Sequence, residues 1–148
     1  MHKKPSNYEE LKQHIQVRKF AQDKQIDGAR SYYCGRGSKP GFIDGHIGNP
    51  FLMGRHGDRI TVCLNFMNLL KGNFKAIPIF EIWHLEYLRS KALTAMRIIK
   101  MDAIAHPTEP IHLYCHCRPL KCHCDFIKDE MIRKLAGVWK IDTLTPKP

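Results

Sequence analysis

The sequence predicts a small single-domain α/β protein with a Rossmann-like layer fold, in which helices flank a partly parallel sheet. Short segments with the pattern of strands alternate along the chain with segments whose apolar residues have helical spacing. The length of 148 residues and the apolar content of 43% suit one domain with its own core. No uninterrupted apolar run of about eighteen residues occurs, so we expect no membrane contact.

The chain divides into an N-terminal basic helix with its connection, over residues 1–30, and the α/β domain, over residues 31–148. Apolar residues fall near one face of residues 6–21, which predicts an amphipathic helix. Ser6 and Glu9 have the spacing of a capping box at its start. Basic side chains lie at its polar positions, where they could contact phosphate or only solvent: Lys12, Arg18, Lys19 and Lys24.

The first half of the α/β domain contains one strand and one helix. The predicted strand covers residues 31–34 and ends abruptly in a loop rich in glycine and proline, which continues to Gly54. Asp58 can cap a helix over residues 59–70, and Gly72 can end this helix.

The second half begins with a long helix, predicted over residues 78–104, whose apolar positions cover more than a narrow stripe. A short buried strand follows at residues 111–114, and a helix follows over residues 126–135. Gly137 can end this helix, and residues 138–144 can form a last strand.

Residues 115–125, with the sequence Cys-His-Cys-Arg-Pro-Leu-Lys-Cys-His-Cys-Asp, are the most informative segment of the chain. They hold four of the six cysteines and lie where the strand of residues 111–114 ends and the last helix begins. Free backbone N–H groups and the helix dipole favour an anion at such a junction. We therefore expect the chemistry of the protein, or a metal site, at this cluster.

A zinc site is the first of three interpretations of the cluster. Cys115 and Cys117 are two residues apart on a strand, so they share a face. With Cys122 and either His123 or Cys124, they could complete a tetrahedral zinc site.

The other two interpretations need no metal. Cys122 or Cys124 could be a nucleophile, since a helix N-terminus and nearby basic residues lower the pKa of a thiol. Alternatively, backbone N–H groups and His123 bind a phosphate, and the thiols only pack. The basic neighbours in both cases are Arg118 and Lys121.

Two loops upstream also carry residues that suit a phosphate ligand. In the loop over residues 35–39, glycines permit positive φ and close approach, and Arg36 offers a bidentate guanidinium. This loop matches neither the Walker pattern nor the full dinucleotide fingerprint. In the turn Gly-Asn-Pro-Phe, Asn49 could bind a ligand hydroxyl or brace the loop through its own backbone. The predicted phosphate-binding residues are Gly35, Gly37, Ser38, Lys39, Arg118 and Lys121.

The chain carries a formal net charge of +10. A folded and broadly basic protein commonly binds polyanions, most often DNA or RNA. Simple solubility is the alternative explanation, because charge alone identifies no groove, strand or sequence.

Three motifs in this order resemble the pattern of a domain family of unknown function that is widespread in phages and bacteria. They are Gly-Arg-Gly-Ser at residues 35–38, Gly-Asn-Pro-Phe at residues 48–51, and Cys-x-Cys-x-Pro-Leu-x-Cys-His-x-Asp at residues 115–125. The resemblance covers roughly residues 31–136. It implies a compact α/β fold with a site formed by these loops.

The family usually has a small residue, often glycine, at the position of Cys124. The matched positions of the third motif are therefore Cys117, Cys122, His123 and Asp125. Because all three motifs suit a phosphate, we expect the three loops to converge on one pocket.

We expect a DNA-acting enzyme, an endonuclease or nickase of phage type that cleaves the DNA backbone, with uracil-derived abasic or damaged sites as candidate substrates. His123 would be the general acid or base, and Arg36 and Lys39 would stabilise the phosphoryl charge. Asp125 would orient His123 or cap the helix. Asn49 and Cys122 complete the predicted catalytic set. We expect His123 and Arg36 to lie outside the core.

The alternative function is a hydrolase or binding protein for a nucleotide or an ADP-ribose-like ligand, and a zinc-stapled inhibitor of a host protein is a third. Candidate cofactors are a structural Zn²⁺ and a Mg²⁺ ion. DNA is the expected partner, and a host DNA repair enzyme is a candidate protein partner. Six cysteines without an export signal suggest reduced thiols and a cytoplasmic location, in the host cell if the protein is phage-encoded.

Overall fold

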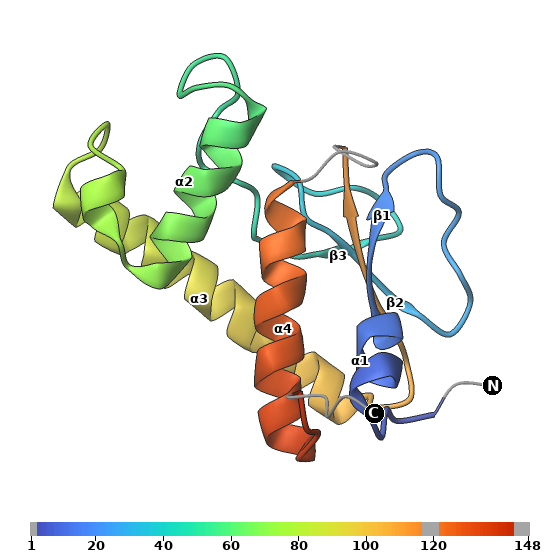
Figure 1. Ribbon diagram of the computed structural model, residues 1–148. Helices are drawn as coiled ribbons and strands as arrows, with labels where there is room; N and C mark the ends of the chain where they lie inside the picture. The colour runs from blue at the N-terminus through green and yellow to red at the C-terminus, as the bar shows by residue number, and fades with distance from the viewer. Residues whose placement is uncertain (1–2, 117–121, 144–148) are drawn as a thin grey trace.

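A four-stranded parallel sheet forms one side of the molecule in the computed structural model, which describes residues 3–116 and 122–143 (Figure 1). The strands are β1 (Ile15–Lys19), β2 (Arg30–Tyr33), β3 (Ile43–Asp44) and β4 (Ile111–Cys115). Their order in space is β1-β4-β2-β3, and every described pair is parallel. Every residue of β4 is buried, as is typical of an inner strand covered on both faces. The predicted α/β fold class is confirmed.

Helices occupy the space beside the sheet. They are α1 (Tyr8–His14), α2 (Arg59–Lys71), α3 (Ile82–Ala105), α4 (His123–Trp139) and the short 3₁₀ helix η1 (Phe74–Ala76). Helix α4 contacts β1 and β4 and also the other three α-helices. Figure 1 shows it in the middle of the molecule, with the sheet on one side and α2 and α3 on the other. Helix α4 is therefore packed on several sides.

A polar contact joins β2 to α3. Asp102, near the end of α3, accepts a hydrogen bond from Arg30 Nε at 2.6 Å and another from the hydroxyl of Tyr32. Burial and the Asp102 carboxylate raise the pKa of Tyr32, so its hydroxyl keeps the proton that it donates. This contact fixes β2, and with it the loop that follows β2.

The predicted helix over residues 6–21 is wrong in its second half. Helix α1 ends at His14, and the next five residues form β1, in which Ile15 lies opposite Ile111 of β4. Unpaired backbone groups along β4 would be costly in a buried setting, so pairing with β4 prevails over local helical preference. The sheet therefore begins upstream of the strand predicted at residues 31–34.

The start of α1 also differs from the predicted capping box. Asn7 is the N-cap, and its side chain accepts a hydrogen bond from the backbone N–H of Glu10 at 2.9 Å. Ser6 donates to the carboxylate of Glu10 instead. The cap is thus one residue later than predicted, with Glu10 in place of Glu9.

The two central helices agree better with the sequence pattern. Asp58 caps α2 by accepting from the N–H of Thr61 at 2.8 Å, and Gly72 ends α2 with a φ of 76°. Helix α3 begins at Ile82 rather than at residue 78, and it runs unbroken to Ala105. The turn that contains Pro78 precedes this helix.

The end of the chain corrects two predictions. Helix α4 continues past Gly137 to Trp139, and Lys140 ends it in the left-handed region with a φ of 55°. Residues 138–143 form no strand, and residue 144 lies outside the described part. Ile141 instead folds back and is buried in the core.

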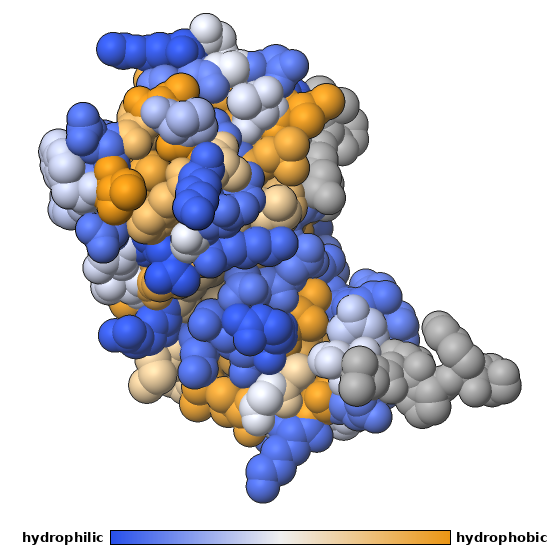
Figure 2. Space-filling view, turned by 60° about the vertical axis from the view of Figure 1, so that its left-hand side comes forward, coloured by the Kyte–Doolittle hydropathy of each residue, from blue (hydrophilic) through white to orange (hydrophobic). Residues whose placement is uncertain are grey.

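The outer surface of the molecule is mixed. Figure 2 shows apolar side chains gathered in its upper half, at the height of α2 and the start of α3. The exposed large aliphatic residues of this region are Ile60, Leu64, Ile79 and Ile82. Within the described ranges, no helix combines the length and the apolar character needed to cross a membrane.

Candidate functional site

The three predicted loops converge at the carboxyl ends of β2 and β4. A cavity of about 260 Å³ lies there and is lined by residues of all three motifs. These residues are Gly35 and Arg36 of the first motif, Asn49 and Phe51 of the second, and Cys115, Cys122 and His123 of the third. In parallel sheets, ligands bind at this edge. The convergence that the sequence predicted is present in the structure.

His123 holds the loops together from within the core. It is the first residue of α4 and is 7% exposed, so the prediction that it lies outside the core is wrong. Its Nε2 atom lies 2.9 Å from the carbonyl oxygen of Cys34 and 3.0 Å from that of Ile47. Because carbonyl oxygens only accept, Nε2 carries the proton. The ring also packs edge-on against Phe66, with centroids 5.1 Å apart.

This geometry restricts the acid–base role predicted for His123. Its Nε2–H is shared between two backbone carbonyls, so any proton transfer to a ligand falls to Nδ1. Nor is Nε2 available to ligate a metal or a phosphate in this conformation.

Arg36 and Asn49 join the first two loops. Arg36 is exposed, as predicted, and its Nη2 donates to the carbonyl oxygens of Asn49 at 2.7 Å and Phe51 at 3.4 Å. The Asn49 side chain accepts from the N–H of Phe51 at 3.0 Å and donates to the carbonyl of Val62 at 3.1 Å. Of the two roles considered for Asn49, the structure shows the bracing role.

Asp125 caps α4, which is one of its two predicted roles. Its Oδ2 accepts a hydrogen bond from the backbone N–H of Cys122 at 2.9 Å, in a capping box with Cys122 as N-cap. The Cys122 thiol is fully buried, and its Sγ lies 3.2 Å from the Sγ of Cys115. A thiol with no exposed surface is poorly placed to attack a substrate.

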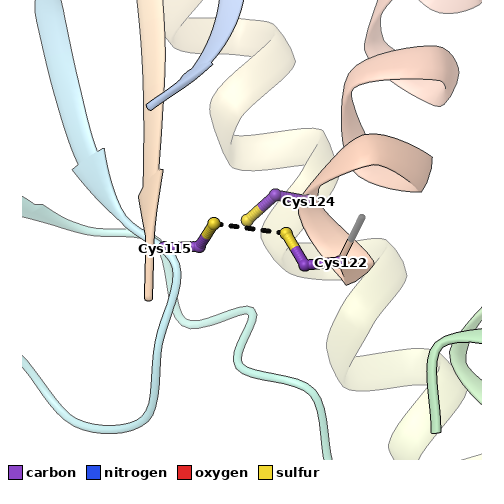
Figure 3. Close-up of side chains that lie close together, drawn as sticks. All are labelled: Cys115, Cys122 and Cys124. Atoms are coloured by element: carbon purple, nitrogen blue, oxygen red, sulfur yellow. Dashed lines mark hydrogen bonds between the residues drawn. The ribbon is translucent and has the colours of Figure 1, made fainter. Parts of the chain in front are cut away.

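The described cysteines of the third motif point toward one another (Figure 3). The sulfur atoms of Cys115, Cys122 and Cys124 all lie within 4.8 Å of one another, and all three residues are buried. Hydrogen bonding of the protonated Cys124 thiol with Cys115, Cys122 and Cys34, together with burial, raises the pKa of Cys124 well above its usual value. The lowered thiol pKa predicted for Cys124 is therefore wrong.

The predicted zinc ligands are brought together only in part. Cys115 and Cys122 lie side by side. Of the two residues considered as a further ligand, His123 and Cys124, it is Cys124 that joins them. Cys117, Arg118 and Lys121 fall outside the described residues.

The first loop approaches the rest of the site closely at a glycine. A Cβ atom on Gly35 would overlap the ring and hydroxyl of Tyr33, so a larger residue there would displace the Tyr33 side chain. Gly37 has a φ of 75°, and Ser38 is exposed to solvent. Lys39 Nζ lies 5.6 Å from the ring centre of Tyr33, a cation–π distance.

Sequence reasoning missed the pair formed by Tyr33 and His116. Both line the cavity, with Tyr33 Oη 2.8 Å from His116 Nε2. Partial burial and the charges of Lys39 and Lys19 lower the pKa of His116. His116 lies two positions after the strand predicted at residues 111–114, so its position at the carboxyl edge could have been inferred from the sequence.

Arg59 was also missed, and no sequence signal pointed to it. It is the first residue of α2 and lines the same cavity as Arg36. Among the described residues that line this cavity, none is a carboxylate. The chemistry of the lining therefore favours an anionic ligand.

A second cavity adjoins the first. It has a volume of about 370 Å³ and shares Gly35, Arg36 and Asn49 with the first cavity. Its lining adds Asp44 and Lys91. Arg36 and Asn49 thus stand between two neighbouring compartments.

Comparisons with known proteins bear on this arrangement. Neither the curated proteins nor the solved structures contain a match to the chain. The family model for the domain of unknown function DUF4326 matches residues 15–133, which begin with β1 and end within α4. This range includes all three loops and most of the chain, so the protein belongs to the DUF4326 family.

Proposed function

We propose that the protein is a DNA-acting enzyme, an endonuclease or nickase, which holds a phosphodiester of the DNA in the 260 Å³ cavity and cleaves the backbone there. One observation carries this proposal. The cavity is lined by Arg36 and Arg59 and by no carboxylate among the described lining residues. Two guanidinium groups can neutralise a phosphate and stabilise the charge that develops during its cleavage.

His116 is a better candidate for proton transfer than His123. It is exposed at the rim of the cavity, whereas His123 is buried and shares its Nε2 proton with two carbonyls. A general acid or base must come within hydrogen-bond reach of the substrate. We therefore assign the acid–base role to His116 and a positioning role to His123.

The size and charge of the site suit one nucleotide of a longer strand. A cavity of about 260 Å³ is at the small end for ligand sites and suits one sugar-phosphate unit. The charge of +10 would hold the flanking phosphates. An abasic or damaged nucleotide, including one derived from uracil, leaves the base stack at the lowest cost, so such sites are the proposed preferred substrates.

A supercoiled-plasmid assay tests this proposal. Untreated, uracil-containing and abasic plasmids are incubated with the full chain, in magnesium and in chelator. Mg²⁺ usually needs carboxylate ligands, which the described lining does not supply, so we expect nicking in chelator as well. Nicking that depends strictly on magnesium would contradict this assignment of the site.

Matched variants locate the activity. Arg59→Ala should lower the nicking rate by about a hundredfold or more, a range typical for a charge-stabilising group. Arg133→Ala is the control, because it removes the same charge from an exposed position on α4, where Arg133 pairs with Glu130. Equal rates for the two variants, or no nicking of any plasmid by the native protein, would overturn the proposal.

A second candidate function is a hydrolase or binding protein for a free nucleotide or an ADP-ribose-like ligand. The adjoining cavity of about 370 Å³ favours it, because two compartments on either side of Arg36 could hold a phosphate and a base. Calorimetry with nucleotides and ADP-ribose, followed by chromatography of the products, tests this function. Turnover of these ligands, with plasmids left intact, would favour it over the nuclease.

A further inference from the structure

Three cysteine thiols meet beneath the candidate site, and a fourth buried cysteine lies near them. Cys115 ends β4, and Cys122 and Cys124 lie at the start of α4. Cys34 follows β2 and is fully buried, and its thiol is near enough to help raise the pKa of Cys124, although it lies outside the group of three sulfur atoms within 4.8 Å of one another. We propose that these four residues bind one zinc ion as thiolates, in a structural site that joins β2, β4 and α4.

The spacing of the sulfur atoms suits a single ion. Zinc bound by cysteine has Zn–S bonds of about 2.3 Å, so the sulfur atoms of a tetrahedral site lie about 3.8 Å apart. In the structure, Cys115 Sγ and Cys122 Sγ are 3.2 Å apart, and the three sulfur atoms of Cys115, Cys122 and Cys124 all lie within 4.8 Å of one another. The tetrahedral spacing falls between these two distances. A cluster of several iron atoms would separate its ligands further.

Cys34 completes the set from a different part of the chain. The other three ligands lie within ten residues of one another along the chain, whereas Cys34 directly precedes the first motif. It lies against the cluster because β2 is the neighbour of β4 in the sheet. A carbon atom built on Gly45 would lie 3.4 Å from Cys34 Sγ, so Gly45 leaves room beside this sulfur.

The chemistry of binding follows from the state of the thiols. Without metal, the hydrogen bonds among the thiols and their burial favour the neutral form. When zinc binds, each of the four sulfur atoms forms a bond to the ion and releases its proton to solvent. No electron is transferred. The resulting centre has a net charge of −2, which the N-terminal end of α4 stabilises through its backbone N–H groups.

Two other accounts of the cluster explain less. A disulfide between Cys115 and Cys122 would need its sulfur atoms about 2.05 Å apart rather than at the observed 3.2 Å, and it would leave two thiols unused. Packing of neutral thiols alone gives no reason for three sulfur atoms to lie within 4.8 Å of one another with a fourth buried cysteine beside them. A zinc ion would fix the floor of the cavity, which Cys115 and Cys122 help to line.

Metal content and metal spectroscopy of the full chain test this inference independently of any activity on DNA. The protein is produced without a histidine tag, and its zinc is measured by elemental analysis. We expect about one zinc per chain. The metal-free protein, prepared with chelator under reducing conditions, is titrated with Co²⁺. Tetrahedral thiolate ligation should give intense visible d–d bands and near-ultraviolet charge-transfer absorption.

Single serine variants assign the ligands. Cys34→Ser and Cys124→Ser should each lower zinc affinity by more than about a hundredfold, beyond the range for residues that only orient ligands. Cys63→Ser is the matched control, because Cys63 is a buried cysteine on α2, whereas the proposed ligands lie at β2, β4 and α4. It should retain the zinc. The cobalt spectrum of the native chain keeps the test informative if a ligand variant does not fold.

Three results would overturn the inference. The first is a folded native protein that contains no zinc and gives no thiolate spectrum with cobalt. The second is full zinc affinity in Cys34→Ser. The third is loss of zinc in Cys117→Ser with retention in Cys34→Ser, which would make Cys117 the fourth ligand.

Discussion

His123 shows how a residue with suitable chemistry can have a structural task. Its sequence position, after a cysteine and at the start of a helix, favoured proton transfer. In the structure, the residue is 7% exposed, and its Nε2–H bonds two backbone carbonyls, each of which directly precedes one of the upstream motifs. One side chain therefore holds all three motifs in contact, which is a sufficient physical reason for a histidine at this position.

We predict that His123→Ala lowers the free energy of unfolding by about 2–4 kcal/mol, because it leaves a cavity beside Phe66 and removes a donor from two carbonyls. Urea denaturation followed by circular dichroism measures this change. His123→Gln keeps a donor and should lose less. An alanine variant as stable as the native protein would show that the two carbonyls find other donors.

At the residue scale, the sequence located the site but not every role within it. The four clustered cysteines and the motif loops stood out by residue type and spacing alone. Arg59 and Cys34 did not stand out in this way. Arg59 reaches the site through the packing of α2 against α4, and Cys34 reaches it through the pairing of β2 with β4. Contacts between residues so distant in sequence depend on strand order, and spacing along the chain does not determine that order.

Among the elements, α2 begins at the residue that the sequence predicted, as β4 also does. The Asp58 carboxylate accepts from the N–H of Thr61, and this hydrogen bond lowers the pKa of Asp58. Arg59 and Val62 of helix α2 line the candidate site, and the carbonyl of Val62 also accepts a hydrogen bond from the Asn49 side chain. The cap therefore stabilises the wall of the cavity.

We predict an acid-dependent contribution of this cap to stability. The folded pKa of Asp58 is below its unfolded value, so the contribution is complete above about pH 4 and is lost as the pH falls through the folded pKa. Asp58→Ala should lower the melting temperature by a few degrees at neutral pH. This difference should shrink in acid. Asp27→Ala, in an exposed loop, is the control.

The misassigned elements have a common cause. Residues 15–19 have the composition of a helix end, yet they pair with β4, and residues 138–139 extend α4 rather than starting a strand. In both places the tertiary partner decides the structure. The alternation of Ile15 and Val17, both β-branched, was the available signal for β1. The strand after α4 was predicted although no neighbouring strand had been identified that could pair with it.

The charge of the whole molecule leads to a prediction about DNA binding. Excess positive charge of +10 should produce binding by counterion release. Affinity for duplex DNA, measured by fluorescence anisotropy, should fall by at least about tenfold between about 50 and 200 mM salt. Arg59→Ala should weaken binding only slightly, because it removes one contact of several. A flat salt response would favour the free-nucleotide function instead.

The strand order has a consequence for how the chain is made. β4 lies between β1 and β2 in space but follows both of them by more than 75 residues along the chain. On the ribosome, β1 and β2 therefore emerge long before the strand that separates and joins them. Until residues 111–115 leave the exit tunnel, the backbone groups of β1 and β2 that pair with β4 have no partner strand. The two early strands therefore stay open to mispairing. We expect stalled nascent chains that end before residue 111 to be cleaved readily by protease, and chains that expose α4 as well to become resistant.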